Sequence, residues 1–137
     1  MSYFDETGKN LRPELLNEEA QSAANQFIVK WPNGKTDENN SIKNSQLRRF
    51  FNEFKNLERQ LNQRQGNEDE AFRSIKPLVK MANAKVVYAK ARKVVPESFV
   101  KWLQVNVQSI ETAKDFKAFL LHFEAVVGFC YGLNPKD

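Results

Sequence analysis

The sequence is poor in the residues on which most catalytic and metal sites depend. It contains one cysteine, Cys130, and one histidine, His122, among 137 residues. Zinc and haem sites draw their ligands largely from these two residue types, so we expect no metal and no cofactor. A single cysteine also excludes an internal disulfide and fits a reducing cytoplasm.

Cys130 and His122 are not expected to form a catalytic pair either. A cysteine nucleophile needs its histidine within hydrogen-bond reach. The two residues are eight positions apart in one predicted helix, which separates them by about 12 Å along its axis. We interpret Cys130 as a small core residue and His122, at the edge of an apolar stripe, as a packing or interface residue.

Glycine clusters and long apolar runs are also missing. The five glycines are Gly8, Gly34, Gly66, Gly128 and Gly132, too scattered for a phosphate-binding loop. No apolar run approaches the roughly 20 residues of a membrane helix, and the first residues lack the pattern of a secretory signal. The sequence therefore predicts a cytoplasmic protein that is not an enzyme and has no membrane partner.

The charges that are present are unevenly distributed. The net charge is +4, yet residues 41–95 contain 13 cationic and 5 acidic side chains, whereas residues 1–40 contain 4 and 7. A positive field over the middle of a compact domain favours polyanionic partners. A solvated lysine-rich surface would give the same composition, so composition leaves both interpretations open.

Apolar residues recur at three- and four-residue steps along most of the chain, the periodicity of amphipathic helices. A polar leader over residues 1–12 precedes a helix over 13–31, and a flexible loop over 33–43 follows. The later helices are expected over about 44–65, over about 68–94, from Pro96 and Glu97 onward, and from Thr112 onward. The sequence therefore predicts an all-α fold, a compact bundle of about five helices in a single domain, 1–137.

Local signals refine these boundaries. Asn44 or Ser45 is a good N-cap for the second helix. Pro77 lies well inside the pattern of the third helix, so we expect a kink or short break there. Thr112 and Asp115 resemble a capping box at the start of the last helix, with aspartate in place of glutamate.

The helix over 44–65 carries the clearest binding pattern. Its phenylalanines and leucines fall within an arc of about 120° that should face the core. Beside this arc lies a stripe of polar and cationic residues with no acid among them, a spacing that suits phosphate contacts. The stripe consists of Arg48, Asn52, Lys55 and Arg59. Arg49 points elsewhere and is expected to form an exposed ion pair with Glu53.

Glu58 projects into the apolar arc of the same helix, and a buried carboxylate needs a partner. The third helix offers Lys85 and Arg92, which lie seven residues apart on one side with Tyr88 nearby. Either cation would then be structural. A second basic patch, on a different side of the third helix, consists of Lys76 and Lys80, which are further candidates for phosphate contacts.

Three blocks of the sequence resemble a known family in their order and character. They are SQLRRF at 45–50, AKVVYAKAR at 84–92 and FEAVV at 123–127. Over about residues 42–131 the chain is similar to the small helical subunit of type III-A CRISPR effector complexes, the Csm family. None of the three blocks is a catalytic motif.

The resemblance implies a compact, non-catalytic subunit present in several stacked copies along the guide RNA–target RNA duplex. Such a subunit touches the RNA backbone without reading sequence, while base pairing supplies the specificity. The resemblance also implies self-association, as a dimer or stacked filament, and contact with other Csm subunits. The implied RNA contacts are Arg48, Lys55, Arg59, Lys85 and Arg92.

Two other classes of protein fit the same pattern. A helical DNA-binding regulator would need a short helix-turn-helix, for which the turn around Gly66 is a candidate, although the flanking helices look long for that motif. A purely structural adaptor would use its charge for solubility and its helix faces to bind protein.

Overall fold

Helices make up nearly all the regular structure of residues 2–135, the part of the chain that the computed structural model describes. In order they are η1 (Pro13–Leu16), α1 (Glu18–Phe27), α2 (Asn44–Gln63), α3 (Glu68–Lys80), α4 (Ala82–Ala91), α5 (Glu97–Ser109) and α6 (Ala113–Leu133). Over this range the only β pairing is two isolated bridges. The all-α prediction is confirmed, and because α3 and α4 are two halves of the predicted third helix, so is a bundle of about five helices.

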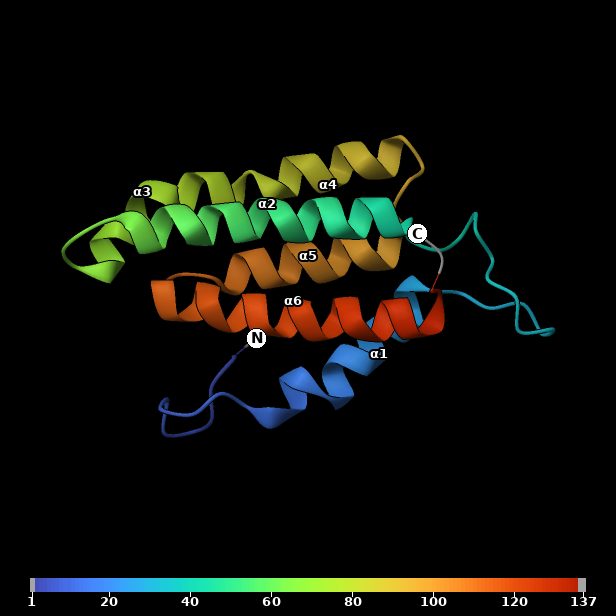
Figure 1. The fold of residues 1–137 in the computed structure, drawn as a ribbon, viewed down its shortest axis with the longest axis horizontal. Coiled ribbons are helices and arrows are strands. Elements are labelled where there is room, and N and C mark those ends of the chain that lie inside the picture. The colour runs from blue at the N-terminus through green and yellow to red at the C-terminus, as the bar shows by residue number, and fades with distance from the viewer. Residues whose placement is uncertain (1, 136–137) are drawn as a thin grey trace.

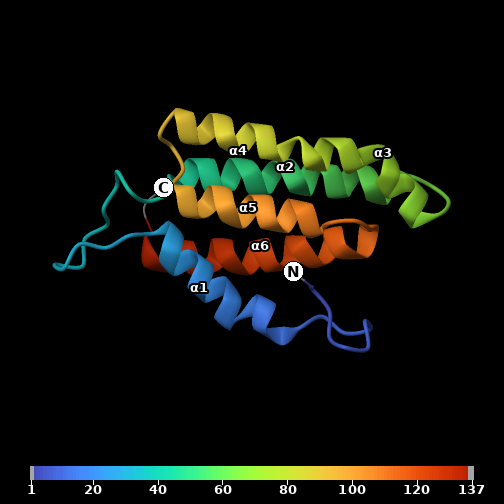
Figure 2. The ribbon, with the colours of Figure 1, turned by 180° about the vertical axis from the view of Figure 1, so that it is seen from behind.

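The long helices lie side by side, and α1 crosses the bundle obliquely (Figures 1 and 2). α1 packs on α6, α2 packs on both α3 and α6, and α4 packs mainly on α5. α3 and α4 follow one another along one edge of the bundle (Figure 1). α2 and α4 are therefore neighbours that are each held mainly by other helices.

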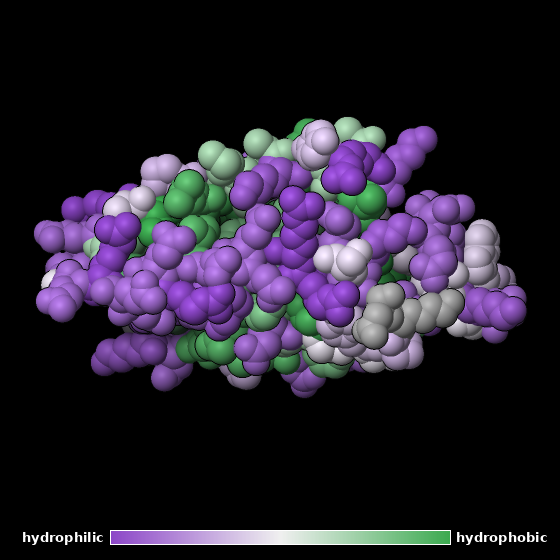
Figure 3. Space-filling model, turned by 45° about the horizontal axis from the view of Figure 1, so that its top comes forward, coloured by the Kyte–Doolittle hydropathy of each residue, from purple (hydrophilic) through white to green (hydrophobic). Residues whose placement is uncertain are grey.

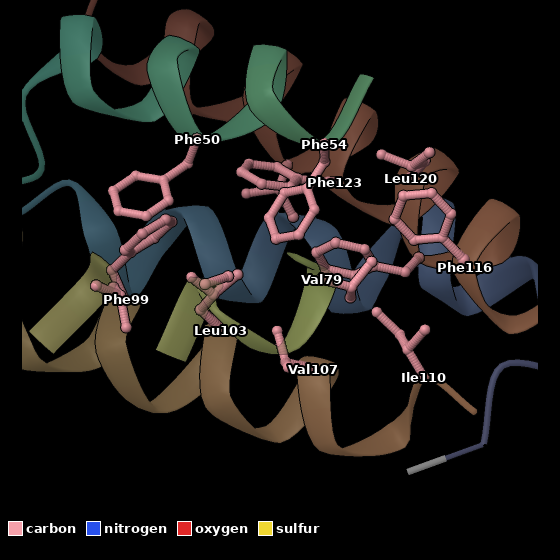
Figure 4. Close-up of a cluster of buried hydrophobic side chains, with 14 of the residues drawn as sticks. Phe50, Phe54, Val79, Phe99, Leu103, Val107, Ile110, Phe116, Leu120 and Phe123 are labelled. Atoms are coloured by element: carbon pink, nitrogen blue, oxygen red, sulfur yellow. The ribbon is translucent and has the colours of Figure 1, made fainter. Parts of the chain in front are cut away.

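An aromatic cluster fills the space between α2, α5 and α6. The ring of Phe123 lies 5.0 Å from Trp102 and 5.3 Å from Phe51, centre to centre, both in edge-on geometry. Phe54 approaches Phe119 in the same way at 5.1 Å. Edge-to-face pairs add to the stabilisation from buried area. Figure 4 shows the rings of α2 pointing down onto those of α5 and α6, so the phenylalanines of the predicted apolar arc do form core.

The N-terminal helix is shorter than the periodicity predicted. The helix expected over 13–31 is interrupted at Asn17, whose φ of −133° and ψ of −95° are not helical, and it ends at Phe27. Ile28 is extended, and Lys30 pairs with Thr36 across a turn. Trp31 consequently lies outside the helix with 53% of its surface exposed, so its place on the apolar stripe was a coincidence of spacing.

The third predicted helix breaks four residues after Pro77. α3 continues through Pro77 to Lys80, and α4 starts at Ala82 after Met81. The Met81 N–H still donates to the Pro77 carbonyl at 3.0 Å, so the turn that follows Pro77 is closed, and the bond that proline removes is the one to the Arg73 carbonyl in the turn before it. The helix then ends at Ala91, before the predicted residue 94, because Lys93 adopts a left-handed φ of 63°.

The start of α2 is tied to the end of α6 by Asn44, a residue expected to be a cap. Lys43, and not Asn44 or Ser45, is the N-cap of α2 and makes no side-chain cap bond. Asn44 is buried, and its amide donates to the Asn134 carbonyl at 2.8 Å. The predicted capping box at the start of α6 is confirmed, with Asp115 in the reciprocal position.

α6 is long and apolar enough to cross a membrane by length and composition alone, which corrects the expectation that no apolar run approaches this length. Its residues account for much of the bundle core: those buried include Phe116, Phe119, Phe123 and Val126. The apolar character of α6 is therefore explained by packing within the bundle.

Two segments that looked purely polar contribute to the core. Tyr3, in the expected polar leader, is buried and donates its hydroxyl to Asn106 Oδ1 at 2.9 Å. In the loop over 33–43, Ile42 is buried, and so are Asp37 and Ser41. The hydroxyl of Ser41 accepts the Val29 N–H at 2.8 Å, so this loop is fastened close to its C-terminal end.

His122 links three helical segments inside the bundle. The Trp102 indole N–H donates to His122 Nε2 at 3.1 Å, and His122 Nδ1 lies 2.6 Å from the Leu15 carbonyl oxygen. Because the indole can only donate, Nε2 must accept, and Nδ1 carries the proton that goes to Leu15. This arrangement satisfies the neutral imidazole completely and confirms that His122 is a packing residue.

Stability should therefore fall as His122 is protonated. Burial lowers the pKa of His122 below 6.5, outweighing the hydrogen bond to Leu15 and the nearby Glu19 carboxylate. The contribution of neutral His122 is fully present above the unfolded-state pKa of about 6.5 and is lost as the pH drops through the lower folded-state value. Urea unfolding between pH 7.5 and 5 should show this loss, and His122→Gln should flatten it. Equal pH slopes in the two proteins would contradict the assignment.

Phe123→Ala should remove the centre of the aromatic cluster. Phe123 is fully buried, and truncating a buried phenylalanine costs about 3–5 kcal/mol. Leu121→Ala, on an exposed position of the same helix, should change the free energy of unfolding by less than about 0.5 kcal/mol. Chemical denaturation of both variants measures the difference, and similar losses would show that the cluster is not the main source of stability.

Candidate nucleic-acid interface

The α2 stripe of Arg48, Asn52, Lys55 and Arg59 lies on the solvent side of α2, with Lys55 the least exposed of the four. The stripe contains no acid, but an acid from outside it engages one of its cations. Lys55 Nζ lies 2.7 Å from Glu58 Oε1, one helical turn further along. Glu58 thus finds its partner on its own helix, and neither Lys85 nor Arg92 is recruited to it. Arg59 instead donates to the neutral side chain of Asn56.

A groove of about 160 Å³ separates α2 from α4. Phe50 and Ala89 are buried members of its lining, and α2 and α4 supply the polar side chains around them. The complete lining of this α2/α4 groove is Gln46, Arg49, Phe50, Glu53, Lys85, Tyr88, Ala89 and Arg92. The predicted positions Lys85 and Arg92 therefore lie together, with Tyr88 between them.

Glu53 is the electrostatic centre of the α2/α4 groove. Its carboxylate lies 3.6 Å from Arg49 Nε on the same helix and 3.2 Å from Lys85 Nζ across the groove. The predicted Arg49–Glu53 pair is confirmed, and Lys85 shares the same acid. The Arg92 guanidinium instead lies 5.7 Å from the centre of the Tyr88 ring, a cation–π contact.

A second hollow continues the groove towards α3. It is lined by the apolar side chains of Leu57, Leu78 and Ala82 and shares Glu53 and Lys85 with the first. In Figure 3 apolar surface is visible in recesses between polar side chains on this side of the molecule. The Lys85–Glu53 ion pair therefore divides a more cationic end of the groove from a more apolar one.

Lys76 and Lys80 form a separate, compensated patch. Lys76 Nζ lies 2.6 Å from a carboxylate oxygen of Glu111, and Lys80 Nζ lies 3.8 Å from the other. Lys80 also donates to the carbonyls of Val107 and Ile110, at 2.7 and 3.0 Å. A cation bonded to the last carbonyls of a helix stabilises its C-terminus, so Lys80 holds the end of α5.

The contacts from Lys76 and Lys80 also change the pKa of Glu111. The hydrogen bond from Lys76, with the positive charge of Lys80 nearby, lowers the pKa of Glu111. Glu111 therefore stays ionised and keeps both lysines engaged at neutral pH. The predicted site residues thus separate into the α2 stripe, the α2/α4 groove and this patch, and the patch is the least available to an external anion.

Nucleophile and metal chemistry receive no support from the geometry. Burial raises the pKa of Cys130 to about 12, which leaves the thiol protonated, as expected of a core residue. Among residues 2–135 no group of three or more His, Cys, Asp or Glu side chains could hold a metal ion. The described site is an arrangement of cations, one aromatic ring and an apolar floor.

Gln46 and Glu53 were missed as members of the groove. Gln46, Arg49 and Glu53 follow one another at three- and four-residue steps on α2, and Lys85, Tyr88 and Arg92 do the same on α4. Those spacings were available in the sequence. The sequence did not show that the α2 set and the α4 set face each other, because this depends on how α4 packs.

One family model matches the chain. Its description is Csm2 Type III-A, and the match covers residues 11–132. This range extends the resemblance over 42–131 to include η1 and α1. No curated protein and no solved structure matches.

Lys80→Ala should destabilise the fold although Lys80 looks like a surface cation. The substitution removes two charge-assisted hydrogen bonds to the end of α5, a loss of about 1–3 kcal/mol. Lys76→Ala removes the same charge and only an exposed ion pair with Glu111, which should cost less than about 1 kcal/mol. Thermal or urea unfolding of the two variants makes the comparison, and equal effects would refute the capping role.

Proposed function

The chain belongs to the Csm2 type III-A family, the small subunit of type III-A CRISPR complexes, and we propose that it binds the backbone of the guide RNA–target RNA duplex within that complex. The observation that carries the proposal is the α2 stripe, a row of long cationic side chains on the solvent side of a 20-residue helix. We place this activity in the cytoplasm and assign the chain no catalytic role.

The chemistry of the stripe favours backbone contact over sequence reading. Arginine and lysine side chains at successive turns can each satisfy a phosphate. Contacts of this kind fix register and orientation without carrying sequence information. Lys55 is paired with Glu58, and Arg48 and Arg59 mark the two ends of the proposed contact. Lys85 and Arg92 extend the positive surface across the groove.

Assembly with other Csm subunits and with further copies of the chain is part of the same proposal. Large apolar side chains are exposed away from the stripe, including Trp31 in the loop before α2 and Leu121 on α6. Such side chains suit protein contacts. A complex that aligns several copies would multiply the few phosphate contacts that each copy offers, and affinity for RNA would rise accordingly.

A DNA-binding regulator is less well supported. The helix after the turn at Gly66 is α3, which buries Phe72, Ile75 and Val79 in the core. A recognition helix must present a face to the major groove, and the preceding α2 is far longer than the supporting helix of that motif. The adaptor alternative differs from the proposal only in lacking RNA contact, so the experiment below separates them.

Replacing Arg48, Lys55 and Arg59 together by alanine should weaken target-RNA binding by the assembled complex and leave the helical fold intact. Three fewer phosphate contacts should lower the slope of log affinity against log salt by about 2–3. Electrophoretic or filter-binding titrations at several salt concentrations measure both quantities, and circular dichroism checks the fold.

A matched variant removes Lys9, Lys35 and Lys101, three exposed cations outside the stripe, and should leave the salt slope nearly unchanged. Glu58→Gln should strengthen RNA binding and steepen its salt dependence, because Lys55 loses its intrahelical partner and is freer to contact a phosphate. Unchanged RNA protection in the stripe variant, with assembly intact, would overturn the proposal and favour the adaptor.

A further inference from the structure

We propose that the α2/α4 groove is a stacking site for a single unstacked nucleobase, with the Tyr88 ring as its platform. This inference deepens the proposed function and rests on it, since it adds a base contact to backbone binding by the same helix. The ligand is one nucleotide of a bound RNA strand whose base leaves the stack and enters the groove.

Tyr88 is the first reason. It has 65% of its surface exposed, more than any other large hydrophobic residue described. An aromatic ring in this position contributes little to the core, whereas RNA-binding proteins use exposed rings of this kind to stack single bases. The Arg92 guanidinium lies 5.7 Å from the ring centre and so brings a positive charge to the same place.

The composition of the groove is the second reason. Its floor is apolar, from Phe50 and Ala89, as the faces of a base require. The Gln46 amide supplies donors and an acceptor for a base edge. Arg49 and Lys85 share the Glu53 carboxylate in the same cavity, so the positive charge offered to a phosphate comes chiefly from Arg92. An apolar cavity with a few convergent polar groups is the usual form of a small-ligand site.

The groove is also held open. α4 packs mainly on α5, so the α2 and α4 walls are not closely packed against each other. The 3.2 Å ion pair between Glu53 and Lys85 bridges the gap between them. A base therefore enters a preformed space and does not have to separate two packed helices, which lowers the cost of binding.

The groove adjoins the proposed backbone contact. Arg48 belongs to the α2 stripe and Arg49 lines the groove, and consecutive residues of a helix point about 100° apart. A strand whose phosphates follow the stripe therefore reaches the groove by crossing this part of the α2 surface, and can then turn one base into it. Because every base has a π face, the site tolerates any sequence, which is compatible with sequence-independent binding.

The experiment removes bases one at a time from the RNA and the ring from the protein. Complexes assembled with guide RNA and either the wild-type chain or Tyr88→Ala are titrated with target RNAs that each carry one abasic nucleotide, scanned along the whole target. Lost base pairing weakens both complexes alike, so the informative quantity is the ratio between them. We expect at least one position where base removal costs the wild-type complex about fivefold or more beyond its cost to Tyr88→Ala.

Two further variants serve as controls. Tyr88→Trp keeps a stacking face and should retain the effect. Trp31→Ala removes another exposed ring, outside the groove, and should leave the effect unchanged. No position-dependent difference between the wild type and Tyr88→Ala would overturn the stacking site, while the salt response of the stripe variant would still decide the backbone proposal. Loss of the Tyr88→Ala chain from the assembled complex would show that the groove binds protein, and this result would also overturn the stacking site.

Discussion

The aromatic contacts of Phe123 are the interaction on which the rest of the molecule depends. Its ring meets Phe51 from α2 and Trp102 from α5, so one side chain of α6 sets the spacing of the two helices that flank it. Trp102 in turn donates to His122, which accepts at one ring nitrogen and holds Leu15 with the other. The position of α2, and with it the direction of every cation on its outer side, follows from this core.

Acidic side chains decide which cations of the positive middle segment are available. Glu58 engages Lys55, Glu53 engages Arg49 and Lys85, and Glu111 engages Lys76 and Lys80. Exposed pairs of this kind contribute little to stability. Their larger effect is to reduce the positive potential around the cations that they engage, so the field of the basic segment is uneven over the surface.

Periodicity was enough to predict the bundle, because the apolar steps of α2, α5 and α6 coincide with their buried faces. It failed at Trp31, where the spacing continued after the backbone had become extended, and it could not detect the burial of Tyr3. The Glu58 partner was missed because a side chain one turn away competes with any partner on another helix. The α2/α4 groove was out of reach for a different reason: its walls belong to helices that pack on other elements, and no local pattern encodes an absence of packing.

The N-terminal segment has a consequence for the order in which the chain folds. Tyr3 bonds to Asn106 across 103 positions, and His122 contacts Leu15 across 107, while α1 packs chiefly on α6. Contacts between such distant parts of a chain form late, because a long loop must close first. The native contacts between this segment and α6 therefore form only after α6 has been synthesised, whereas local contacts such as the Arg12–Glu19 ion pair can form earlier.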